Sequence, residues 1–129
     1  MDTAKITQAY LECAVWAGND WTQSDGGNPP TLDAAGYTVA DVTPKARAQA
    51  ARVVAEFCQE NERDLYMSGL ADEQIGHDLW LTRNRHGAGF WDRGLPSDLG
   101  KRLTDAAHAM GEQDLMPEDG SLIFSGEEG

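Results

Sequence analysis

The stretch HDLWLTRNRHGAGFWDRG, residues 77–94, decides how this chain is expected to fold. Residues 78–82 and 89–92 are rich in the aliphatic and aromatic side chains that favour strands. Residues 83–87 between them are polar and contain a glycine, which is typical of a turn. We therefore expect a β-hairpin over residues 77–93, with a polar and partly basic tip.

The alternation of side chains along the first of these strands predicts which face meets the core. Leu79 and Leu81 share one face of the strand, and Trp80 lies on the other. If the leucines face the core, Trp80 points toward solvent, a third element or a partner. Trp80 and Trp91 then form either a cross-strand pair that stabilises the sheet or a pair of interface anchors.

The other elements follow from apolar periodicity and turn residues on both sides of this stretch. Apolar residues recur at three- and four-residue steps over residues 3–17, 44–65 and 95–110, which predicts three helices. The sequence Pro-Glu-Asp-Gly between two apolar runs predicts a second hairpin over residues 114–124. The expected fold is α+β: three helices packed on a small antiparallel sheet made of the two hairpins.

Length and composition favour one domain. We expect a single α+β domain over residues 1–124, with a long loop at 18–42 and a short acidic tail at 125–129. No apolar run approaches the roughly 20 residues that a membrane span needs. The first residues lack the basic and apolar regions of a signal peptide, so the expected location is the cytoplasm.

The net charge of −12, from 22 acidic and 10 basic residues, limits the kinds of partner. A chain that binds nucleic acid directly normally carries a basic patch, and a negative field repels phosphate and anionic membranes. The same field attracts a basic surface, such as that of a protein that holds DNA or RNA. The alternative is that the charge only keeps the protein soluble.

Residues 76–93 read GHDLWLTRNRHGAGFWDR. This segment resembles a motif close to GHDxWLTRNxHGAGFWDR in a family of small proteins from tailed bacteriophages and prophages, to which no activity is assigned. Residues 10–16, 37–42, 100–111 and 114–124 resemble other parts of the same family. The resemblance implies a phage or prophage origin, including a location in the host cytoplasm, and it brings no catalytic residue.

Two sets of candidate site residues lie in this segment. The first is a binding surface on the predicted hairpin, made of Trp80, Arg83, Asn84, Arg85, His86, Trp91 and Arg93. Tryptophan and arginine are the residues that most often dominate protein interfaces. The second is an alternative pocket made of His77, Asp78, His86 and Asp92, which requires the hairpin to bring these side chains together.

The sequence offers no further sign of catalysis. No serine stands in a G-x-S-x-G context, and Cys13 and Cys58 lie on the apolar faces of predicted helices, where thiols are inert. Residues 86–89 are glycine-rich but match no phosphate-binding loop. We predict no metal, cofactor or catalytic residue, and an enzyme remains an open alternative.

These observations favour an accessory phage or prophage protein that binds and modulates a host protein. The specific hypothesis is an acidic anti-defence inhibitor, by analogy of class with anti-CRISPR proteins, whose partner has a basic nucleic-acid-binding surface. Exposed acids such as Glu56, Glu60 and Asp105 would then contribute to binding. One alternative is a small enzyme or ligand-binding domain with a His/Asp/Arg site on the hairpin. Another is a virion or assembly component, in which case the chain could be a homo-oligomer.

Overall fold

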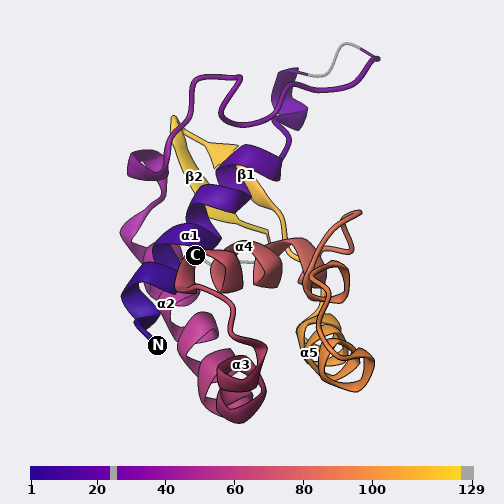
Figure 1. Ribbon diagram of the computed structural model, residues 1–129. Coiled ribbons are helices and arrows are strands. Elements are labelled where there is room, and N and C mark those ends of the chain that lie inside the picture. The colour runs from indigo at the N-terminus through magenta and orange to yellow at the C-terminus, as the bar shows by residue number, and fades with distance from the viewer. Residues whose placement is uncertain (24–25, 126–129) are drawn as a thin grey trace.

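The computed structural model describes residues 1–23 and 26–125. Within these residues the fold is α+β, as expected, but it has five α-helices in place of the three predicted, together with one two-stranded antiparallel sheet (Figure 1). The α-helices are α1 Thr3–Ala17, α2 Pro44–Glu60, α3 Glu62–Ser68, α4 Asp72–Arg83 and α5 Ser97–Ala109. The strands are β1 Leu115–Glu118 and β2 Ser121–Phe124, and the 3₁₀ helices are η1 Trp21–Gln23, η2 Val39–Asp41 and η3 Phe90–Asp92.

The hairpin predicted over residues 77–93 is wrong, because most of its first strand belongs to helix α4. Asp72 and Glu73 lie in the first turn of α4 and Arg83 lies in the last, which suits the helix dipole. Ile75 and Leu79 stand four residues apart and are both buried. The segment that was expected to return as a strand is a loop that ends in η3. The sheet therefore has two strands in place of four.

The second predicted helix is also divided. The helix expected over residues 44–65 ends at Glu60, and α3 begins at Glu62. Asn61 between them has a φ of −118° and a ψ of 22°, outside helical values. Both its backbone N–H and its side-chain amide donate hydrogen bonds to the carbonyl of Phe57, at 3.0 and 2.9 Å.

Helices α1 and α4 lie side by side at the centre of the molecule (Figure 1). Gly76 makes this close packing possible, because a Cβ atom there would lie 2.4 Å from the carbonyl oxygen of Ile6 and 2.8 Å from Cβ of Ala9. Helix α1 starts with Asp2, whose side chain accepts hydrogen bonds from the backbone N–H groups of Ala4 and Lys5. The close contact with α1 sets which face of α4 is turned toward α1.

Aromatic rings join the helices to the remaining elements. Tyr10 of α1 and Trp80 of α4 meet edge to face with ring centroids 5.2 Å apart, and Phe124 of β2 lies 6.1 Å from Trp80. On the other side of α4, Phe57 of α2 stacks on Phe90 of η3 at 5.8 Å. The core is therefore continuous from the hairpin through α4 to α2.

The predicted hairpin at the C-terminal end is confirmed, with Leu115 paired to Phe124 and Glu118 paired to Ser121. The long loop at 18–42 contains η1 and η2, and it is anchored by the buried side chains of Leu32 and Val42. The expected tail at 125–129 lies outside the described residues except for Ser125. No helix in the described part of the chain is long and apolar enough to cross a membrane.

Candidate functional site

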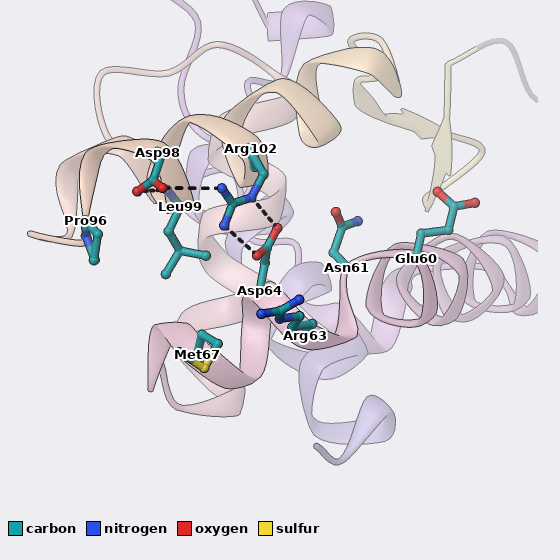
Figure 2. Close-up of a pocket in the computed structure, with 9 residues that line it drawn as sticks. All are labelled: Glu60, Asn61, Arg63, Asp64, Met67, Pro96, Asp98, Leu99 and Arg102. Atoms are coloured by element: carbon teal, nitrogen blue, oxygen red, sulfur yellow. Dashed lines mark hydrogen bonds and ion pairs between the residues drawn. The ribbon is translucent and has the colours of Figure 1, made fainter.

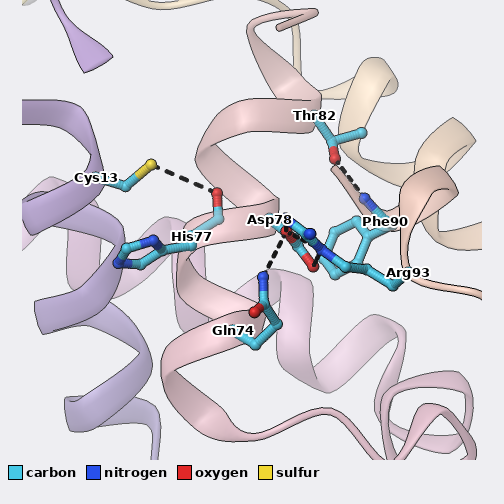
Figure 3. A network of polar contacts seen from close by, with 7 residues as sticks. All are labelled: Cys13, Gln74, His77, Asp78, Thr82, Phe90 and Arg93. Carbon is cyan, nitrogen blue, oxygen red and sulfur yellow. Dashed lines mark hydrogen bonds and ion pairs between the residues drawn. The ribbon is translucent and has the colours of Figure 1, made fainter. Parts of the chain in front are cut away.

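The side chains of Asp78, Thr82 and Arg93 in the 76–93 motif form polar contacts inside the protein (Figure 3). Asp78 is fully buried and accepts three N–H···O contacts of 2.7 to 3.0 Å from the guanidinium of Arg93. It also accepts a hydrogen bond from the side-chain amide of Gln74 at 2.9 Å. The hydroxyl oxygen of Thr82 accepts the backbone N–H of Phe90 at 3.1 Å. These contacts fold the loop after α4 back onto that helix.

Arg83 and Asn84 connect the end of α4 to the end of α5. Arg83 donates hydrogen bonds to the carbonyls of Met110 and Gly111, at 3.1 and 2.8 Å, and to the hydroxyl of Tyr10 at 3.0 Å. Burial raises the pKa of that hydroxyl, although the nearby guanidinium acts to lower it. The side-chain oxygen of Asn84 accepts the backbone N–H of Gln113 at 2.7 Å. Arg83 and Asn84, which were predicted to lie at the tip of a binding hairpin, therefore join the end of α4 to the segment after α5.

The alternative pocket of His77, Asp78, His86 and Asp92 does not form. His77 and Asp78 project to different sides of α4, His77 toward α1 and Asp78 toward Arg93 (Figure 3). His86 lies on the loop after α4 and Asp92 lies at the end of η3, and both are exposed. The expected convergence of these four side chains depended on the hairpin. In the helix that is present, consecutive side chains such as His77 and Asp78 point about 100° apart. Among residues 1–23 and 26–125, no group of three His, Cys, Asp or Glu side chains is arranged to hold a metal ion.

The two tryptophans of the motif differ in solvent exposure. Trp80 was expected to point away from the core, yet it is 2% exposed and packs between Tyr10 and Phe124. Its indole N–H is buried and has no hydrogen-bond partner among the residues that the structure describes. Trp91 in η3 is 54% exposed. Of the candidate binding residues, Arg85, His86 and Trp91 are exposed, whereas Arg93 is mostly buried in its ion pair.

Both cysteines are buried, as expected from their positions on apolar helix faces. Burial raises the pKa of the Cys13 thiol to about 12 and that of the Cys58 thiol to about 11, and nearby carboxylates add to both shifts. The Cys13 thiol donates to the carbonyl of His77 at 3.7 Å. Protonated, enclosed thiols are poor nucleophiles.

A groove of about 590 Å³ lies between α3 and α5 (Figure 2). Its charged groups are partly paired across the two helices, since Arg102 of α5 makes two hydrogen bonds of 2.9 and 3.0 Å to Asp64 of α3. Arg102 also lies 3.6 Å from Asp98 one helical turn earlier. These pairs hold α3 against α5. The groove is a helix junction with mixed charge, and no set of catalytic groups converges in it.

A second groove, of about 540 Å³, lies beside the exposed part of the motif. We call it the Trp16 groove; it is lined by Trp16, Ala17, Thr31, Asp33, Leu81, His86, Gly87 and Ala88. Its residues come from the end of α1, the 31–33 segment, and α4 with the loop after it. Trp16 is 61% exposed, although Val15 beside it is 4% exposed. The exposure of Trp16 was not predictable from the helical pattern, because Trp16 stands next to the apolar face of α1.

Backbone hydrogen bonds fix the walls of the Trp16 groove. The N–H of Asp33 donates to the carbonyl of Val15 at 3.2 Å, and the N–H of Leu32 donates to the carbonyl of Gly18 at 2.9 Å. On the other wall, the N–H of His86 donates to the carbonyl of Leu81 at 2.9 Å. The exposed indole is thus presented by a rigid frame, which limits the entropy lost when a partner binds.

Comparisons of this chain with protein-family models, with curated proteins and with solved structures find no match.

Proposed function

We propose that this chain is an accessory phage or prophage protein that binds and modulates a host protein. One observation carries the proposal: the conspicuous polar groups of the motif bind other parts of the same chain, while a large aromatic side chain, Trp16, stays 61% exposed beside the motif's loop. Exposed tryptophan on a rigid frame is the usual anchor of a protein interface. The phage origin rests on the resemblance of residues 76–93.

The acidity of the chain supports a basic partner. The net charge is −12, and several of the arginines are engaged inside the protein. Charge of one sign on a small protein speeds its encounter with a surface of the opposite sign. A host protein that holds DNA or RNA has such a surface, and an acidic inhibitor would compete for it.

The first experiment is an affinity capture from a host lysate with the tagged protein, with and without nuclease treatment, analysed by mass spectrometry. The proposal expects one host protein at near-stoichiometric yield that persists after nuclease treatment. A well-folded protein that captures no host protein would contradict it. Light scattering of the purified protein separates self-association, which the virion alternative expects, from binding to a host protein.

The charge component has its own matched test. Glu56 and Glu60 are exposed on α2, whereas Asp105 is already engaged by Lys101 at 2.6 Å. The double variant Glu56→Lys/Glu60→Lys should weaken capture, and the double variant Glu112→Lys/Glu118→Lys changes the net charge by the same amount at other exposed positions. Weakening by the first pair alone supports a specific acidic surface. Unchanged affinity with both pairs contradicts the charge-based mode of binding.

A further inference from the structure

We propose that the Trp16 groove receives an arginine side chain from the basic partner. This inference rests on the proposed protein-binding function and names the chemistry of its contact. The groove is concave and lined by Trp16, Leu81, Ala88 and Ala17, so it offers apolar surface to the aliphatic part of a long side chain. A guanidinium group stacks on the face of an exposed indole more readily than an ammonium does.

Two acidic residues, Asp33 and Glu12, accompany Trp16, one in the lining of the groove and one on the same helix. Asp33 lines the groove together with Trp16. Glu12 precedes Trp16 by four residues on α1, which places the side chains of Glu12 and Trp16 on the same surface of that helix. Neither carboxylate forms an ion pair within residues 1–23 and 26–125. One oxygen of Asp33 accepts the backbone N–H of Ala34 at 2.9 Å, which fixes the carboxylate at the rim.

The groove lacks a positive charge from lysine or arginine among the described residues that line it. Its partner is therefore expected to supply one. The combination of an aromatic face, an apolar floor and acidic rim groups complements arginine in both shape and charge. The same combination disfavours a phosphate, which would meet Asp33 at the rim and the overall charge of −12.

The test uses ¹⁵N NMR of the four tryptophan indole N–H signals, assigned with single Trp→Phe variants. The probes are a capped tri-arginine peptide and a capped tri-citrulline peptide, which has nearly the same shape without the charge. The inference expects the Trp16 signal to shift in a saturable way with tri-arginine, with citrulline binding at least about fivefold weaker. Asp33→Asn should weaken the arginine effect severalfold. Buried Trp80 and exposed Trp21 and Trp91 serve as internal references.

Three results would overturn the inference. The first is that the Trp16 signal does not shift with tri-arginine. The second is that the Trp16, Trp21 and Trp91 signals shift alike, which means that the peptide is attracted only by the net charge of the protein. The third is that tri-citrulline shifts the Trp16 signal as strongly as tri-arginine does. Any of these results, together with successful capture of a host protein, would contradict arginine binding in the Trp16 groove without contradicting the proposed function. A saturable arginine effect that Asp33→Asn weakens supports the groove even before the host protein is known.

Discussion

Arg93 forms an ion pair with Asp78, which lies fifteen residues earlier in the sequence and whose carboxylate is completely shielded from water. The shortest N···O distance is 2.7 Å, and the exposed fractions of the two side chains are 28% for Arg93 and 0% for Asp78. This pair connects α4 to the residue that follows η3. It therefore holds the intervening loop, including His86, in the position that forms one wall of the Trp16 groove.

The first prediction concerns the strength of this pair. Asp78→Asn removes the charge that balances Arg93 and should lower the free energy of unfolding by about 2–4 kcal/mol, since breaking a buried pair leaves one group uncompensated. Arg93→Met should cost a similar amount, and the double variant should cost less than the sum of the two. Urea unfolding followed by tryptophan fluorescence measures all three. Additive effects would mean that the two residues are not coupled.

The second prediction concerns the contact between α1 and α4. Gly76→Ala should lower the free energy of unfolding by about 1–3 kcal/mol or more, because the new methyl group meets backbone of α1. Gly87→Ala is the matched control, since a Cβ atom at Gly87 has no heavy atom within 4 Å. Thermal unfolding of both variants checks the difference. Equal stability of the two variants would contradict the packing described for Gly76.

The third prediction concerns the thiols. Since burial raises the pKa of Cys13 to about 12 and of Cys58 to about 11, both thiols are protonated and enclosed at pH 8. A disulfide reagent such as DTNB should label neither at an appreciable rate in the folded protein and both after denaturation in guanidinium chloride. Rapid stoichiometric labelling of one thiol in the folded protein would show that it is accessible and reactive.

The fourth prediction is a pH dependence. Hydrogen bonds from Arg102 hold the pKa of Asp64 below its ordinary value of 3.8. A depressed pKa stabilises the fold above that value, and the stabilisation is lost as the pH falls through the pKa of the folded state. The stability difference between the wild type and Asp64→Asn should therefore shrink as the pH is lowered below about 4. In an Arg102→Met background this pH-dependent difference should largely disappear.

Elements with a complete local signal could be predicted from the sequence. Residues 3–17 and 97–109 carry an uninterrupted apolar stripe, and Thr43-Pro44 marks the start of α2. The turn at 117–120 lies between apolar runs and forms the expected hairpin. In each case the deciding residues are close in sequence, so local propensity and tertiary packing agree.

The hairpin predicted over residues 77–93 is wrong because the helix that contains residues 77–83 begins earlier in the sequence, at Asp72. Asp72 and Glu73 form the acidic first turn of α4, and Ile75 and Leu79 have the four-residue spacing of a helix. The run from Asp78 to Thr82, taken alone, favours a strand. Aromatic and β-branched residues in a short window suit a buried helix as well as a strand. Contacts between residues distant in sequence, such as the close packing of Gly76 against α1, stabilise the helix here.

The candidate site was predictable only in part. Arg85, His86 and Trp91 are exposed, as a binding surface requires, but Trp80 and Arg83 are buried in the core. Trp16 was missed as a candidate, because the groove beside it is assembled from segments that are far apart in the sequence. A pattern within one segment could not indicate which of its polar groups would find partners elsewhere in the chain.

The exposed indole of Trp16, next to the 86–88 loop, is the proposed contact of this protein with a host protein. The most direct measurement is the affinity of the captured host protein for the wild type, for Trp16→Ala and for Trp21→Ala, by isothermal titration calorimetry on variants of equal stability. Trp21 is 64% exposed, so its variant removes an equally accessible indole outside the groove. Trp16→Ala should weaken binding at least about tenfold, and Trp21→Ala should leave it within about twofold. Unchanged affinity of Trp16→Ala would contradict the proposed contact.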